Sequence, residues 1–102
     1  LVVDTGIHHY RWTREEGIDY YMNNTANPEG DCVGMVERHI VWPGQAVSYK
    51  IGMLKMQELR AYAESTLGDN FSIQAFHDIV LKNGAVPMDI LQDIVVQWVE
   101  NQ

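Results

Sequence analysis

Apolar residues recur along this chain at spacings of three and four, the period of an amphipathic α-helix. No stretch alternates apolar and polar residues in the way that a half-buried strand does, so we expect no sheet. Glycine, proline and asparagine divide the apolar stripes into helical segments at residues 13–24, 28–41, 44–67, 72–83 and from 87 onward. Residues 1–3 resemble the last turn of another helix, stopped by Gly6. The pattern therefore predicts an all-α fold of about five helices.

Local signals mark where these helices begin and end. Thr13 and Glu16 have the spacing of a capping box, in which each side chain binds the backbone N–H of the other residue. Pro28 and Pro87 suit a first helical position, where a missing N–H leaves no hydrogen bond unmade. Ser72 is expected to cap the helix that follows it, and Gly68 to end the segment before it.

The segment at 44–67 is the longest and is apolar on two faces, which is typical of a helix packed between neighbours. We therefore predict that it is the central and most buried helix. The expected buried anchors lie on apolar stripes or at helix junctions, and they are Trp42, Leu54, Phe76 and Trp98.

Composition narrows the possible functions. With 46% apolar and 21% charged residues the chain has the composition of a globular domain, and its formal charge of −7 argues against nucleic-acid binding. No apolar run approaches the roughly 18 residues that a membrane-spanning helix needs. Cys32, the single cysteine, is expected to be a small buried apolar residue. Because the chain opens at Leu1 without Met, we expect residues 1–102 to be one helical segment of a larger protein.

Two stretches differ in composition from the apolar stripes and solvated faces of the predicted helices. Residues 4–12 (DTGIHHYRW) bring a carboxylate, two imidazoles, a phenol and a guanidinium together around a glycine, although a polar interhelical loop would have a similar composition. The adjacent His8 and His9 lack the four-residue spacing of a helical zinc site, and so do His39 and His77. We therefore predict no metal site within this chain.

The second stretch is residues 42–52 (WPGQAVSYKIG), where Gln45, Tyr49 and Gly52 share one face of the predicted helix. A tyrosine there can donate a hydrogen bond to a developing oxyanion, and Lys50 can bind a carboxylate. The alternative is that Tyr49 only ties two helices together and that another helix packs closely at Gly52.

Four longer strings stand out along the chain: LVVDTGIH at 1–8, WTRE at 12–15, WPGQA at 42–46 and SYKIG at 48–52. They resemble the C-terminal signature of the bacterial family called domain of unknown function 885, whose large helical members are similar to gluzincin zinc metallopeptidases such as carboxypeptidase Taq. Shorter matches at 59–60, 67–68 and 76–78 follow in order, so the resemblance covers nearly the whole chain.

This resemblance implies a zinc-dependent peptidase-like hydrolase whose metal ligands and general base lie upstream of the matched part. The chain alone would then be inactive, and its partner would be the rest of the parent polypeptide. Within the whole protein it would form the wall of the cleft opposite the metal, facing a peptide-like substrate. His8 and Tyr49 match the residues that would stabilise the tetrahedral intermediate, and we expect them to line one concave surface with Gln45. Lys50 and Arg60 are further candidates for substrate binding.

Two other readings stay open. A non-catalytic helical module could bind a partner protein through an exposed apolar face. A monomer with a buried core would favour such an autonomous module, whereas self-association through a large apolar face would favour a piece of a larger protein. A helical domain without any site is the third reading. The family resemblance also implies a location in the cell envelope, as a lipoprotein or in the periplasm.

Overall fold

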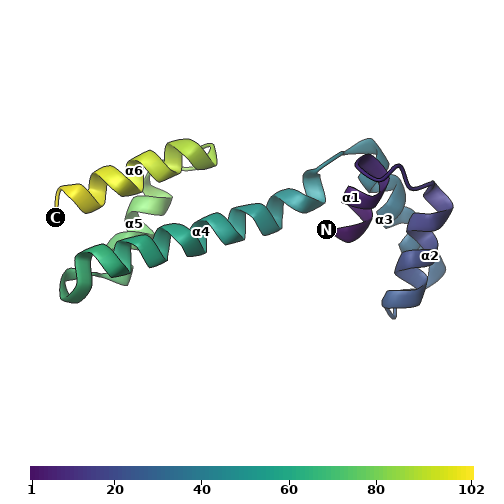
Figure 1. Cartoon of the computed structure of the whole chain (residues 1–102), viewed down its shortest axis with the longest axis horizontal. Coiled ribbons are helices and arrows are strands. Elements are labelled where there is room, and N and C mark those ends of the chain that lie inside the picture. Colours follow the sequence, from purple (N-terminus) through teal and green to yellow (C-terminus); the bar gives the residue numbers. More distant parts are fainter. The chain divides into compact units, whose positions relative to one another are not determined.

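The computed structural model describes all residues, 1–102, and contains helices and no strand, so the all-α prediction is confirmed. There are six α-helices rather than about five, joined by turns and one short 3-10 helix, η1 (Gly68–Asn70) (Figure 1). The six are α1 (Val2–His8), α2 (Arg14–Asn24), α3 (Glu29–Val41), α4 (Gln45–Leu67), α5 (Ile73–Lys82) and α6 (Met88–Glu100). They form two compact units, Leu1–Ile51 (the first unit) and Gly52–Gln102 (the second unit), and α4 contributes to both.

In the first unit, α1, α2 and α3 all contact one another (Figure 1). They approach closely at Gly17 of α2, where an added Cβ would lie 3.2 Å from Val3 of α1 and 3.3 Å from Val36 of α3. The buried face of α3 consists of Cys32, Val36 and His39, at helical spacing. Cys32 is fully buried, as predicted.

The prediction that Gly6 stops the first helix was wrong. Helix α1 continues through Gly6 to His8. A Cβ at Gly6 would lie 2.4 Å from Cε3 of Trp12, so the missing side chain makes room for the Trp12 indole ring. The chain then reverses at Arg11, whose φ of 60° is unusual for a residue other than glycine.

The predicted helix ends are largely confirmed. Thr13 and Glu16 form the reciprocal capping box, and the Ser72 hydroxyl accepts a hydrogen bond from the Ala75 N–H. Pro28 and Pro87 are the N-cap residues and not the first helical residues, so each of these two helices begins one residue later than predicted. The turn at 42–44 separates α3 from α4, and its Gly44 has a φ of +78°, a conformation that glycine adopts at no steric cost.

The core of the second unit is formed by the C-terminal half of α4 with α5 and α6, the latter two of which pack together (Figure 1). Its buried residues are apolar side chains from all three helices, namely Leu59, Ala63, Phe76, Leu91, Val95 and Val99. Burying this apolar surface supplies the main driving force for folding of the second unit.

Burial was predicted less well than secondary structure. Phe76 is buried, and Trp98 is partly buried against the same core. Trp42 is 56% exposed and Leu54 is 51% exposed, so these two anchor predictions were wrong. Helix α4 is the longest, as predicted, but not the most buried, because only Leu59 and Ala63 along its length are buried. None of the helices has the combination of length and apolarity required to cross a membrane.

Candidate functional site

Asp4 and His8 lie one turn apart on α1, so both side chains point from the same side of that helix. The Asp4 carboxylate is buried, and its Oδ1 accepts a hydrogen bond of 3.1 Å from the Gly44 N–H, immediately before α4. Its other oxygen, Oδ2, is buried without a hydrogen-bond partner. Asp4 therefore fixes the start of α4 against α1.

The His8 ring is held between Asp4 and α3. Its Nε2 lies 2.8 Å from the backbone carbonyl oxygen of His39 and 3.6 Å from Asp4 Oδ1. A carbonyl oxygen can only accept, so Nε2 carries the proton and donates to it. The Nδ1 atom of a neutral His8 is then the acceptor that remains for another group.

His39 is the centre of the polar network in the first unit. Its ring Nε2 lies 2.7 Å from the Tyr21 hydroxyl, and the two rings stack with centroids 6.0 Å apart. Burial lowers the pKa of His39 below its ordinary value of 6.5, although the nearby charge of Asp4 acts in the opposite direction. Burial also raises the pKa of Tyr21 above 10.0. A neutral His39 accepting from a protonated Tyr21 hydroxyl accounts for both directions.

An open groove of about 410 Å³ lies between α3 and the start of α4. Its lining combines apolar, basic and amide side chains, namely Met35, Arg38, His39, Gln45, Ala46 and Tyr49. Tyr49 is 70% exposed, and its hydroxyl lies 3.5 Å from Gln45 Nε2, at the limit of a hydrogen bond. His39 therefore belongs both to the buried network and to the groove wall.

The structure brings some of the predicted site residues together. Gln45 and Tyr49 line one groove, and His8 binds the backbone of His39, which lines the same groove. That His8 and Tyr49 face one substrate atom stays a prediction. Lys50 is exposed on α4 and is not among the groove residues. Arg60 belongs to the second unit, where its Nε donates to Glu64 at 2.8 Å.

Four polar residues of this region were not among the candidate site residues expected from the sequence: Asp4, Tyr21, Arg38 and His39. A signal was present for two of them. Asp4 precedes His8 by four positions, as expected of a carboxylate–imidazole pair on one helix face, and His39 continues the inward stripe of α3. The Tyr21–His39 pair joins two helices and has no local signal.

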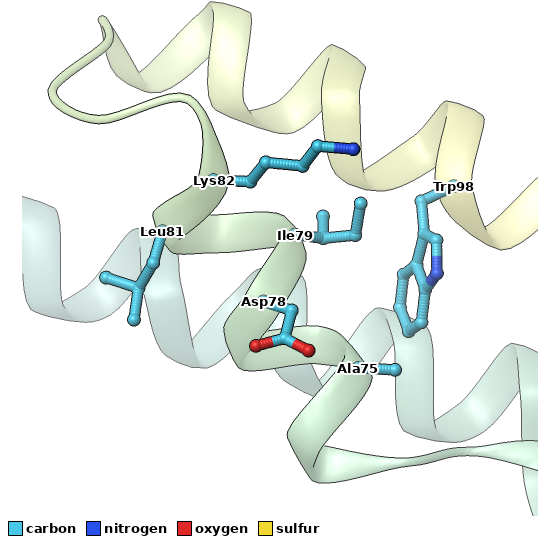
Figure 2. A pocket seen from close by; sticks show the side chains of 6 residues that line it. All are labelled: Ala75, Asp78, Ile79, Leu81, Lys82 and Trp98. Atoms are coloured by element: carbon cyan, nitrogen blue, oxygen red, sulfur yellow. The ribbon is translucent and has the colours of Figure 1, made fainter.

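A larger hollow of about 620 Å³ lies in the second unit, between α5 and α6. Figure 2 shows the Trp98 indole and Ile79 beside the long Lys82 side chain, with Asp78 one turn before Lys82 on α5. None of the predicted site residues lines this hollow. We assign the candidate site to the smaller groove because only that groove adjoins a buried polar network with a perturbed histidine.

No group of three or more His, Cys, Asp or Glu side chains lies close enough together to hold a metal ion. Asp4 and His8 approach each other, but their other hydrogen-bond partners are the backbone groups of Gly44 and His39. The residues of this chain therefore do not fit a zinc site.

Comparison with known proteins shows a family and a similar solved structure. The family described as "Bacterial protein of unknown function (DUF885)" matches residues 1–95. A crystal structure described as that of the putative lipoprotein from Colwellia psychrerythraea is 51% identical in sequence and superimposes with a TM-score of 0.93. The match covers 99% of this chain but only 17% of that one, so the present chain spans about one sixth of its length. No curated protein matches.

Proposed function

Because the chain belongs to the DUF885 family of bacterial proteins, we propose that it forms one wall of the substrate cleft in a longer zinc-dependent, peptidase-like hydrolase. A relative at 51% identity of which this chain matches only 17% is consistent with such a partial contribution. The rest of the parent polypeptide is then its partner and completes the cleft.

The observation that carries this proposal is the double role of His39. Its carbonyl oxygen accepts from His8, while its side chain lines the groove that also holds Gln45 and Tyr49. His39 thereby connects His8 to the groove that contains Tyr49, although His8 and Tyr49 are about forty positions apart in sequence. The groove surface is backed by a hydrogen-bonded network, which restricts the rotamer of the His39 side chain in the groove wall.

Tyr49 and His8 have the chemistry for stabilising charge on a scissile carbonyl. The Tyr49 hydroxyl is exposed and can donate to an oxygen atom as negative charge develops on it. His8 is oriented through Nε2, which leaves Nδ1 free to bind substrate or, once protonated, to donate. Gln45, four residues before Tyr49, offers a carboxamide that can bind a peptide backbone. Lys50 and Arg60 stay candidates for contacts with more distant parts of the substrate.

Zinc, which the family resemblance implies, has no ligand set in this chain. Its ligands and the general base would have to come from the rest of the polypeptide. The contribution proposed for this chain is therefore limited to orienting the substrate and donating hydrogen bonds. A location in the cell envelope is part of the proposal, supported by the similarity to a structure described as a lipoprotein.

The test is turnover of peptide substrates by the full-length polypeptide that contains this chain. Tyr49→Phe is expected to lower kcat by roughly 10²–10³-fold, as the loss of an oxyanion donor does. The matched control is Tyr10→Phe, because Tyr10 is 69% exposed and lies outside the groove. Equal activity of both variants would refute the assignment of Tyr49, and absence of peptide hydrolysis by the unmodified protein would refute the function.

A non-catalytic interaction module is the second candidate, and the exposed apolar side chains favour it. Val41 is 71% exposed, and Trp42, Ile51 and Leu54 are each more than half exposed. Apolar exposure of this kind marks surfaces that other proteins cover. Sedimentation velocity of the chain distinguishes the candidates: a stable monomer would favour the interaction module, whereas self-association that Trp42→Ser disrupts would favour a wall that the rest of the polypeptide covers.

A further inference from the structure

We infer that Arg38 is the residue through which the groove binds a carboxylate group of its substrate, an assignment that rests on the proposed function. Arg38 was not among the substrate-binding residues expected from the sequence. It lines the groove together with Gln45 and Tyr49, on the α3 side.

Arg38 is one of four Lys and Arg side chains that form no ion pair in the structure, and it is the one of these four that lines the groove. Three of the seven Lys and Arg side chains are already neutralised by nearby carboxylates: Arg14 by Glu37, Lys55 by Glu58 and Arg60 by Glu64. Arg38 takes part in no ion pair, and the adjacent Glu37 binds Arg14 at 2.7 Å. In a chain with a formal charge of −7, an unpaired guanidinium in a groove is a local site for an anion.

The position of the Arg38 guanidinium is restrained by Trp42, one turn further along the chain. The Cζ atom lies 5.5 Å from the centroid of the Trp42 ring, within the range of a cation–π contact. A guanidinium held against an aromatic ring through its face keeps its in-plane N–H groups available for a bidentate contact with a carboxylate. This arrangement also accounts for the 56% exposure of Trp42, which supports a surface group instead of filling the core.

The two acidic groups near the groove do not occupy this position. Asp4 is buried on the α1 side and binds the Gly44 N–H, and Glu37 is held by Arg14. The first turn of α4 contains no acidic residue, so the positive end of its helix dipole also favours an anion near Gln45. A substrate carboxylate at Arg38 would place the adjoining peptide backbone along the wall that carries Gln45 and Tyr49.

A peptide offers a carboxylate either at its C-terminus or on an Asp or Glu side chain, and one set of peptides separates these sources. Each peptide is made as the free acid, as the C-terminal amide, and with its internal Glu replaced by Gln. The full-length polypeptide is assayed for kcat and KM with each. Binding of a fluorescent, labelled form of each peptide is measured in parallel by polarisation.

Arg38→Gln is expected to raise KM by roughly 10–100-fold for the peptide that carries the recognised carboxylate, with kcat nearly unchanged, because a charge-assisted hydrogen bond is lost. The peptide that lacks this carboxylate should bind both proteins equally weakly. Arg38→Lys should restore part of the affinity, since it retains the charge but loses the bidentate geometry. Arg11→Gln, at an exposed arginine outside the groove, is the control.

If amidation of the peptide abolishes the effect of Arg38→Gln on KM, the recognised carboxylate is the C-terminus. If replacing the internal Glu with Gln abolishes it, the recognised carboxylate is the Glu side chain. Equal effects of Arg38→Gln on all three peptides, or none, would overturn the assignment. If no peptide is hydrolysed but the carboxylate preference in the binding assay still depends on Arg38, the proposed function fails and the role of Arg38 stands. If peptides are hydrolysed but neither KM nor binding depends on Arg38, the proposed function stands and the role of Arg38 fails.

Discussion

Replacing Gly6 with alanine is expected to destabilise the first unit, whereas the same replacement at Gly34 is expected to stabilise it. Both glycines lie inside helices, where alanine is favoured by up to about 1 kcal/mol. The two sites differ in their surroundings. Nothing lies within 4 Å of a Cβ built at Gly34, whereas one built at Gly6 meets three ring carbons of Trp12 at 2.4–2.8 Å.

Carbon atoms in contact are normally about 3.5–4.0 Å apart, so the Trp12 ring would have to retreat by roughly 1 Å. Its backbone N–H is bonded to the Gly6 carbonyl oxygen at 3.0 Å and its ring packs against Tyr20, which restricts that movement. Overpacking of this kind costs about 1–3 kcal/mol, which outweighs the gain in helix propensity. The effect of Gly17→Ala on stability should lie between those of Gly6→Ala and Gly34→Ala, because its Cβ would lie 3.2–3.3 Å from Val3 and Val36.

The assay is urea unfolding followed through amide NMR signals of residues 1–51, so that the second unit does not contribute. Gly34→Ala is expected to raise the free energy of unfolding by about 0.5–1 kcal/mol, and Gly6→Ala to lower it by up to about 2 kcal/mol. If Gly6→Ala stabilised the unit as much as Gly34→Ala, the close packing of α1 against Trp12 would be refuted.

Two further predictions concern a core side chain and a buried histidine. Phe76→Ala should cost about 3–5 kcal/mol in urea unfolding of the second unit, whose core Phe76 joins; a loss below about 1 kcal/mol would contradict its burial. Because the pKa of His39 is lowered in the fold, the unfolded chain binds the extra proton first as the pH falls below 6.5. Stability should therefore decrease from pH 7 toward pH 5.5, and His39→Gln should reduce this slope; an unchanged slope would contradict the prediction.

The helices and their caps could be predicted from the sequence because their causes are local. Thr13 and Glu16 are three residues apart, and Ser72 lies three residues before the N–H that it binds. The role of Gly6 could not be predicted in this way. A glycine that ends a helix and one that receives an aromatic ring look the same in sequence, and the contact with Trp12 depends on the reversal at Arg11.

Burial and the polar network were harder to predict for a related reason. An apolar stripe shows which face of a helix favours contact, but not whether another element covers it, so Trp42 and Leu54 were wrongly expected to be buried. The candidate site was only partly visible in the sequence. Tyr49 and Gln45 share a helix face, but the link from His8 to their groove passes through His39, on a different helix.

The central claim is that His8 and Tyr49 act on the same substrate atom, and a double-mutant cycle in the full-length polypeptide tests it most directly. The values of kcat/KM for His8→Gln, Tyr49→Phe and the double variant are converted to activation free energies. If both side chains stabilise one developing charge, the combined loss should fall short of the sum of the single losses by about 1 kcal/mol or more. Losses that add to within about 0.5 kcal/mol would show two independent sites and contradict the claim.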